Sequence, residues 1–396
     1  MNHYPSNVKE KLNSIILSMA EHHWLFSKNP GNDFTRQHLG KLSFYDTMRL
    51  IISMGKGSTN DEIMDYFDLD PDLIPSQSAF CQRRRQISLS AFEYLFSEFS
   101  SSFPSTTDKF KDHCILACDG CHVVYATNSD IIEDYNKPRL IDYKGYNHMH
   151  LNGFVDVISK AFLDVVIQPG QQPDEREALH SMLDHFTPDD PQKYIITADH
   201  GYESYDLLFH CELKNLGYVF RVKSPSSPKS ILSYYASELP DDLEEFDVTI
   251  KRFFTDKATN IMKSQSDVYR YINPSKNTPH FYELLRKNTV IFISCSFALL
   301  RSKQPEFLRQ EIYSRLILYN FGIFIANEAA EENRKKKRDG SNKYLYELDF
   351  SSALKTARKF FMRRDSGRHI DIIRLMMKYV HAVKDRFRQF QRPLRG

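Results

Sequence analysis

The sequence lacks several features that would assign it to a class at once. It contains six cysteines and one tryptophan in 396 residues, so it is not a disulfide-stapled secreted fold. It has no apolar, uncharged run of 18 or more residues, and its first residues lack the order of a signal peptide. We therefore expect a cytoplasmic protein without a membrane partner, built from two to three domains.

Charge is distributed unevenly along the chain, although the net charge is only +2. Residues 301–396 contain 23 Lys and Arg against 11 Asp and Glu, whereas residues 1–300 contain 30 against 40. A basic end on an acidic body indicates an anionic polymer as partner, with nucleic acid as the first candidate. We expect four consecutive cations to neutralise phosphates without reading sequence. They are Lys335, Lys336, Lys337 and Arg338.

Residues 1–110 show the apolar spacing of helices. One helix is predicted over Leu42–Met54, a second over NDEIMDYFDL with Thr59 or Asn60 as its cap, and a third from Ser76 or Ser78. The third helix carries a cluster of cations beside two glutamines, a composition that suits a recognition helix on DNA. A plain solvated surface is the alternative. The clustered cations are Arg83, Arg84 and Arg85.

The pattern changes to strands after residue 112. HCILACDG, YNHMHLNGFVDVIS and AFLDVVIQPG predict three strands in a row, followed by a helix at DEREALHSMLDHF with Asp174 and Glu177 at capping-box spacing. A strand at KYIITAD, a helix at SYDLLFHCELKNLG ended by Gly217, and a strand at YVFRVK come next. This order predicts an α/β fold, an RNase H-like mixed sheet flanked by helices.

Less regular sequence follows residue 223. Its strand-like segments FDVTIKRFF and DVYRYI predict a β-rich insertion, and a long helix is expected from Pro305. The chain is therefore expected to divide into four parts. These are a helical DNA-binding region (1–110), an RNase H-like core (111–223), a truncated β-rich insertion (224–300) and C-terminal helices with a basic tail (301–396).

Two aspartates end the apolar runs of predicted strands. Asp119 precedes Gly120, and Asp199 follows the run that ends at Ala198. A carboxylate at the end of a buried strand needs a cation, and two on adjacent strands form a hard-oxygen site for Mg²⁺, or Mn²⁺ in its place. Such a site suits two-metal phosphodiester chemistry. The alternative is that each aspartate only caps a strand-to-turn junction.

Other polar residues lie near these strands. His148 and His150 alternate along one strand and share a face, so they could line the site near Asp119, although buried strand histidines without a function are common. Arg221 and Lys223 alternate after the last predicted strand and could meet DNA phosphates.

The segments ILACDG, YIITADHGYES, YVFRVKS and PEFLRQEIYSRLILYNF resemble motifs of DDE transposases of bacterial insertion sequences, of the insertion-sequence-four type. The resemblance implies Asp119 and Asp199 as catalytic metal ligands, with Mg²⁺-dependent cleavage at element ends and strand transfer. It also implies double-stranded DNA as partner, a homodimer in the DNA complex, and association with the bacterial nucleoid. His200 stands where many relatives have arginine.

The third acid of this family is missing from its expected place. The family's order is Tyr, two residues, Arg, three residues, Glu, six residues, Lys, and no position in this sequence fits it. The segment RKNTVIFISCSFALLR stands where the glutamate helix is expected, so our hypothesis is an internal deletion or frameshift. The rival is that Glu311 substitutes. A DNA-end-binding relic or repressor and a structure-selective RNase H-like nuclease remain as alternative functions.

Overall fold

The chain forms two compact units in a computed structural model. One unit contains residues 1–104 and 299–396, and the other contains residues 105–298. The structure describes the following residues: 3–35, 42–103, 112–138, 145–224, 227, 230–233, 247–253, 279–285, 304–336, 345–363 and 370–383.

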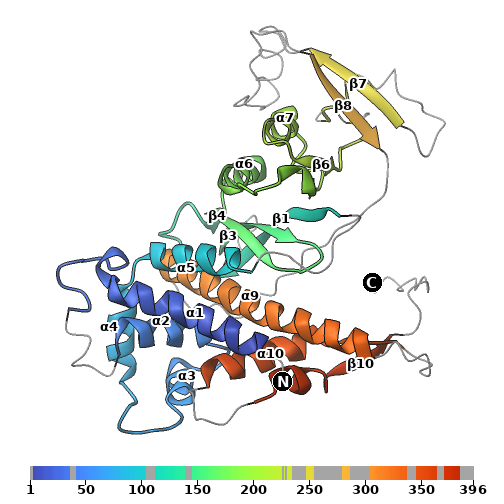
Figure 1. The fold of residues 1–396 in the computed structure, drawn as a ribbon. Helices are drawn as coiled ribbons and strands as arrows, with labels where there is room; N and C mark the ends of the chain where they lie inside the picture. Colours follow the sequence, from blue (N-terminus) through green and yellow to red (C-terminus); the bar gives the residue numbers. More distant parts are fainter. Residues whose placement is uncertain are drawn as a thin grey trace. The chain divides into compact units, whose positions relative to one another are not determined.

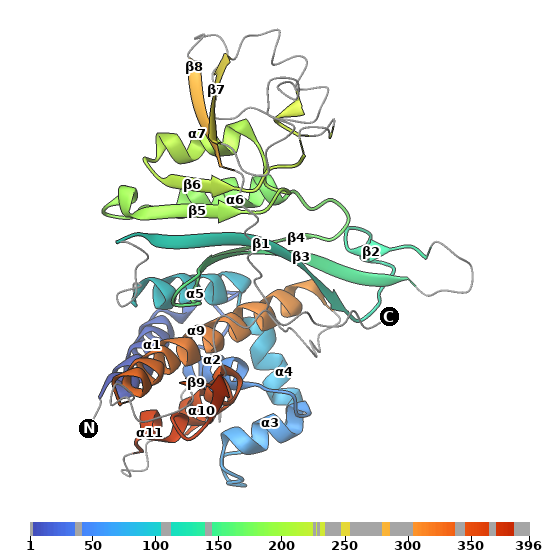
Figure 2. The same cartoon turned by 90° about the vertical axis from the view of Figure 1, so that its right-hand side faces the viewer.

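The first unit is a helical assembly around one long helix, α9 (Pro305–Lys336). Helices α1, α2, α5 and α10 all pack against it, and Figures 1 and 2 show the N-terminal helices and α10 beside it. Leu316, Ile317 and Phe321 of α9 are buried in this packing. The other helices of the unit are α1 (Tyr4–Glu21), α2 (Phe44–Ser53), α3 (Thr59–Tyr66), α4 (Gln77–Gln86), α5 (Leu89–Ser101), α10 (Phe350–Met362) and α11 (Ile372–Met376).

Serine side chains begin the short N-terminal helices. Ser43 and Ser76 accept hydrogen bonds from backbone amides of the first turns of α2 and α4. The expected cap of α3 at Thr59 or Asn60 is wrong, because the cap is Ser58. Its extended backbone lets the hydroxyl accept from Asp61 N, and the Asp61 carboxylate accepts from Ser58 N.

The second unit contains the predicted mixed sheet. Strands β3 and β4 form an antiparallel meander with β1, and β5 and β6 continue the sheet in parallel on the other side of β1. This is the RNase H-like order that the sequence predicts. The strands are β1 (Cys114–Tyr125), β2 (Tyr135–Asn136), β3 (Tyr146–Asp156), β4 (Phe162–Pro169), β5 (Tyr194–Ala198) and β6 (Gly217–Phe220).

Helices α6 (Glu175–His185) and α7 (Tyr205–Leu213) cover this sheet. Cys118 and Ala198 belong to the core that these helices share with the strands. The expected end of α7 at Gly217 is wrong, because Gly217 already begins β6. The turn is made instead by Asn215, whose φ of 54° is a left-handed conformation that asparagine tolerates.

Further strands lie outside the central sheet. The strand expected at FDVTIKRFF is β7 (Asp247–Phe253), which pairs antiparallel with β8 (Pro279–Leu285). In the first unit, β9 (Leu345–Leu348) pairs with β10 (Val380–Val383). The expected strand DVYRYI and the segment RKNTVIFISCSFALLR lie outside the described residues. Among the helices that the structure describes, none has the length and apolar character needed to cross a membrane.

Candidate active site

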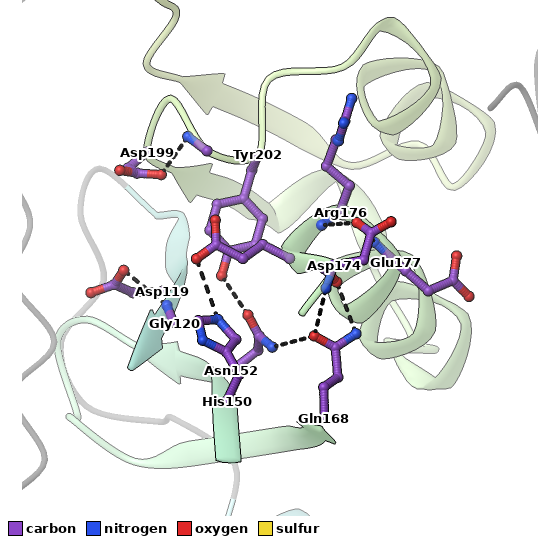
Figure 3. Close-up of polar contacts among 12 residues, drawn as sticks. Asp119, Gly120, His150, Asn152, Gln168, Asp174, Arg176, Glu177, Asp199 and Tyr202 are labelled. Atoms are coloured by element: carbon purple, nitrogen blue, oxygen red, sulfur yellow. Dashed lines mark hydrogen bonds and ion pairs between the residues drawn. The ribbon is translucent and has the colours of Figure 1, made fainter. Parts of the chain in front are cut away.

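The two predicted aspartates lie at matched positions of adjacent strands. Strands β1 and β5 are parallel, and Cys118 is paired with Ala198. Asp119 and Asp199 are the next residues of the two segments, so the fold brings together side chains that are 80 positions apart. Both carboxylates point to the same side in Figure 3. Asp119 lies in the middle of β1, so the expectation that it ends its strand is wrong, whereas Asp199 directly follows β5.

Each aspartate is held by the backbone that follows it. Asp119 Oδ1 accepts a hydrogen bond from Gly120 N at 2.9 Å, and Asp199 Oδ1 accepts one from Gly201 N at 2.7 Å. His200 Nδ1 lies 3.4 Å from Asp199 Oδ2, and both side chains are about half exposed (48% each). The second aspartate is thus accessible to a ligand from solvent.

Sequence reasoning missed a third carboxylate at this place, that of Glu175, the first residue of α6. A Cβ on Gly120 would lie 2.9 Å from Glu175 Oε1. A Cβ on Gly201 would collide with Glu175 Oε2 and lie 3.0 Å from Asp199 Oδ1. Two glycines therefore leave the room that this carboxylate occupies beside the aspartate-bearing segments. The only local signal in the sequence is an acid directly after a helix cap.

A chain of hydrogen bonds lies beneath these carboxylates. The buried Tyr202 hydroxyl donates to Asn152 Oδ1 at 3.0 Å, and Asn152 Nδ2 donates to Gln168 Oε1 at 3.2 Å. Gln168 Nε2 donates to Asp174 O at 2.9 Å. Burial raises the pKa of Tyr202, and Cys118, Glu175 and Asp119 raise it further, so the phenol remains a hydrogen-bond donor.

The predicted pair of strand histidines is part of a group of three on β1 and β3. The rings of His148 and His150 lie 4.5 Å and 5.0 Å from that of His122. His148 and His150 are buried, with 5% and 4% of their surfaces exposed. His150 Nε2 faces Glu175 Oε1 at 3.3 Å. This places His150 beside the carboxylates, whereas His148 Nδ1 contacts Asn136.

The three arginines of α4 differ in their surroundings. Arg84 is turned into the first unit, where it donates to Gln310 Oε1 at 3.2 Å, to Glu311 Oε1 at 3.2 Å and to Phe307 O at 2.7 Å. Arg83 donates to Gln86 Oε1, and its guanidinium lies over a phenylalanine ring. Arg85 is exposed. Of the three, Arg85 is the side chain most accessible to DNA.

The remaining predicted cations also differ in their exposure and in their ion-pair partners. Arg221 is exposed. Lys223 Nζ pairs with the buried Glu203 at 3.0 Å, and Lys223 N donates to the same carboxylate at 2.6 Å. Lys335 is exposed and pairs with Glu331 on α9. The side chains of Lys336, Lys337 and Arg338 lie outside the described residues, and their role stays a prediction.

Glu311, the proposed substitute for the third acid, has a structural contact in the first unit. Its side chain is only 12% exposed and forms an ion pair with Arg84. Among the residues that the structure describes, no three His, Cys, Asp or Glu side chains converge on one point as metal ligands. Asp119 and Asp199 each accept a hydrogen bond from the backbone of a glycine that follows.

Comparison with known proteins identifies the second unit. Residues 110–288, somewhat under half of the chain, match the sequence model of the transposase DDE domain. The chain carries a transposase DDE domain. The matched residues contain Asp119 and Asp199. Transposases with this domain generally use divalent metal ions.

A solved structure and the curated proteins add little to this assignment. The piggyBac transposase in a synaptic complex with hairpin DNA is similar with a TM-score of 0.41 and 10% identity. The alignment covers 96% of this chain and 82% of that one. A similarity this low supports no inference about the DDE domain of this chain. No curated protein matches the sequence.

Proposed function

We propose that this transposase cleaves double-stranded DNA at the ends of a bacterial insertion sequence and joins those ends to a target. The observation that carries the proposal is the matched placement of Asp119 and Asp199 on adjacent parallel strands of a DDE domain. Both acids are hard oxygen donors, which is the donor type that Mg²⁺ and Mn²⁺ prefer.

The side chains at this edge are oxygen donors of the type that a divalent cation takes. The donors are carboxylates, and two glycines leave open the space that a Cβ would fill beside Glu175 and Asp199. Bound metal ions in such sites activate the attacking oxygen and stabilise the leaving one. Asp119 and Asp199 would hold the ions and fix their position against the scissile phosphate. Water would be the attacking group in cleavage, and a DNA 3′-hydroxyl in strand transfer.

The supporting cations would act on the DNA backbone. Arg85 and Arg221 are exposed and free of the buried ion pair that engages Lys223. Neutralising phosphates gives affinity without sequence preference. We further propose that two copies act together on DNA ends, in the bacterial cytoplasm and on the nucleoid.

The finer proposal concerns the activity of this copy. The sequence offers no glutamate at the family's spacing after Asp199, and Glu311 is engaged by Arg84. We propose that the family's glutamate helix was lost by deletion or frameshift. Because that glutamate would help to hold the second ion, its loss should slow cleavage strongly.

A nicking assay tests both the proposed cleavage of element ends and the proposed loss of the third acid. Purified protein is incubated with Mg²⁺ or Mn²⁺ and with DNA that carries the terminal repeats flanking its gene. Slow, metal-dependent nicking that is abolished in Asp119→Asn and Asp199→Asn supports the proposal. Robust cleavage that is abolished by Glu311→Gln would show that Glu311 is the third acid and would overturn the deletion hypothesis.

A second candidate function follows from the same missing glutamate. A chain that still recognises element ends but cannot cut them would act as a repressor of active copies. Gel shifts with end DNA and with branched DNA separate these functions. Binding of ends without metal-dependent cutting indicates the relic, and cutting of branched DNA regardless of sequence indicates a structure-selective nuclease.

A further inference from the structure

We infer that α4 lies in the major groove of double-stranded DNA, where Ser78 and Gln82 read base edges and Arg85 holds a backbone phosphate. This inference rests on the proposed function, in which the transposase acts at the ends of one DNA element. It assigns the choice of DNA sequence to α4 of the first unit, and it separates side chains that select a sequence from one that only adds affinity.

The inward face and both ends of α4 are held by the first unit. Phe80 is only 1% exposed, and the Arg84 guanidinium donates to three acceptors on α9. The Ser76 hydroxyl accepts from a backbone amide of the first turn at 3.2 Å. Gln310 Nε2 donates to Ile87 O, directly after the helix, at 3.1 Å. The outward face of α4 is therefore presented in one orientation, which recognition of a fixed sequence requires.

Three exposed polar side chains form a stripe along the outward face. Ser78, Gln82 and Arg85 are spaced by four and then three residues, so they lie on one side of the helix, and all three are exposed. Gln82 is two residues from the buried Phe80, which places the two side chains on nearly opposite sides of the helix. At about 1.5 Å per residue the stripe is roughly 10 Å long, which matches about three base-pair steps of DNA.

The charge of α4 also favours DNA as the partner of this face. The helix contains three arginines and no acid. The other N-terminal helices either expose acids, such as Glu10 of α1, Asp65 of α3 and Glu98 of α5, or, like α2, consist of buried and half-buried residues. Because exposed acids repel phosphates, α4 is the helix among α1 to α5 whose exposed face complements the charge of DNA.

The residue types of the stripe match what base edges and phosphates offer. A glutamine amide has a donor and an acceptor side by side and can bind N6 and N7 of adenine together, and a serine hydroxyl can donate or accept. Recognition helices contact bases mainly through residues near their N-terminus. Ser78 and Gln82 lie in the first two turns of α4, and Arg85 lies in the last. We therefore assign the base contacts to Ser78 and Gln82 and the phosphate contact to Arg85, whose guanidinium suits phosphate oxygens.

Selection from random-sequence duplexes by the full-length protein without metal tests the base contacts. The unaltered protein should enrich one sequence, with adenine at the position that Gln82 reads. Gln82→Ala should bind that sequence about fivefold or more weakly and accept other bases at this position, and Ser78→Ala should relax a neighbouring position. Gln77→Ala is the matched control, because it removes the same kind of exposed side chain one residue before the stripe. It should change neither the affinity nor the selected sequence.

The phosphate contact and the adenine contact each have a direct readout. Arg85→Ala should weaken binding to the selected sequence and to unrelated DNA by the same factor, and it should lower the slope of log affinity against log salt by about 1. 7-Deazaadenine lacks the N7 acceptor of adenine. DNA that carries it in place of the selected adenine should bind the unaltered protein more weakly but bind Gln82→Ala as before.

Three outcomes would overturn the inference. The first is that no sequence is enriched, and the second is that Gln82→Ala and Ser78→Ala both select the same sequence as the unaltered protein. The third is that Gln82→Ala changes the association of two copies in sedimentation but not the selected sequence, which would make this face a protein contact. The proposed function fails separately: if the selected sequence is absent from the element's ends, or the ends are not cut, α4 still reads DNA but the proposed cleavage is wrong. Circular dichroism checks that each variant folds.

Discussion

At the scale of single residues, Gly120 controls the space beside the carboxylates. A Cβ on Gly120 would lie 2.5 Å from His150 Nε2 and 2.9 Å from Glu175 Oε1, closer than side-chain atoms can approach. Gly120→Ala should therefore lower the free energy of unfolding by about 1–3 kcal/mol and weaken Mn²⁺ binding. Urea denaturation and metal titration measure the two effects. Gly31→Ala is the control, since nothing lies within 4 Å of its added carbon.

Lys223 is a residue whose structural role can be distinguished from a role on DNA. It neutralises Glu203, whose side chain is 1% exposed. Lys223→Met should cost about 1–3 kcal/mol of unfolding free energy, because it leaves a buried carboxylate without its cation. Glu203→Gln in the same chain should restore much of this loss in urea denaturation. A smaller salt dependence of DNA binding in the double variant would show that Lys223 also contacts phosphate.

At the scale of elements, the packing of α4 on α9 depends on one arginine. Arg84→Ala removes three hydrogen bonds to α9 and should lower the free energy of unfolding by about 2–3 kcal/mol. Arg85→Ala should leave stability within about 0.5 kcal/mol and weaken DNA binding, because Arg85 is exposed. Thermal unfolding measures the changes in stability, and gel shifts measure the change in DNA binding. The opposite assignment of effects would mean that α4 meets DNA through Arg84.

The contact between α6 and α7 should make the stability of the DDE domain fall at acid pH. His180 Nδ1 and His210 Nδ1 lie 3.0 Å apart, with Asp206 and Asp184 beside their Nε2 atoms. The pKa of His210 is lowered to about 4, mainly by burial and next by the charge of His180, with a smaller contribution from Lys214. Asp184 and Asp206 act in the opposite direction.

The direction of the pH effect follows from the different pKa of His210 in the folded and in the unfolded chain. Between about pH 6.5 and pH 4 the unfolded chain binds a proton at His210 that the folded chain does not, so stability falls as the pH is lowered. We expect a loss of about 1–2 kcal/mol from this residue between pH 7.5 and pH 5. Urea denaturation at both pH values measures it. His210→Gln should show a smaller difference between the two pH values.

Elements differ in how far the sequence predicts them. The strands β1, β3, β4 and β5 are predictable because each is an apolar run between turn residues, whereas β2 has two residues and no such signal. Asp119 and Asp199 can be selected from the sequence because each follows an apolar run, and their role as metal ligands stays a prediction. Glu175 was missed because its place depends on β1, β5 and α6 closing around two glycines, and no local pattern records that closure.

At the scale of the whole molecule, the DDE domain is inserted between two halves of another unit. Helix α9 follows the domain in sequence but packs against α1, α2 and α5, which precede it. Asn320 of α9 donates to Ser100 Oγ at 2.8 Å, and Gln310 donates to Ile87 O at 3.1 Å. Contacts over more than 200 residues leave no periodic signal in the sequence, so local patterns could not predict this association.

The uneven charge of the chain leads to a prediction about salt. Residues 301–396 carry a net +12, and the run of Lys335, Lys336, Lys337 and Arg338 supplies a third of it. Lys335 remains a cation, since Glu331 raises its pKa. Each neutralised phosphate contributes about 0.9 to the slope of log affinity against log salt, so replacing the four cations by Gln should flatten that slope by up to about 3–4. Preference for end DNA over unrelated DNA should not change, because backbone contacts carry no sequence information. Titrations at several salt concentrations measure both. A slope that stays the same would place the run away from DNA, and a loss of end preference would mean that it reads bases.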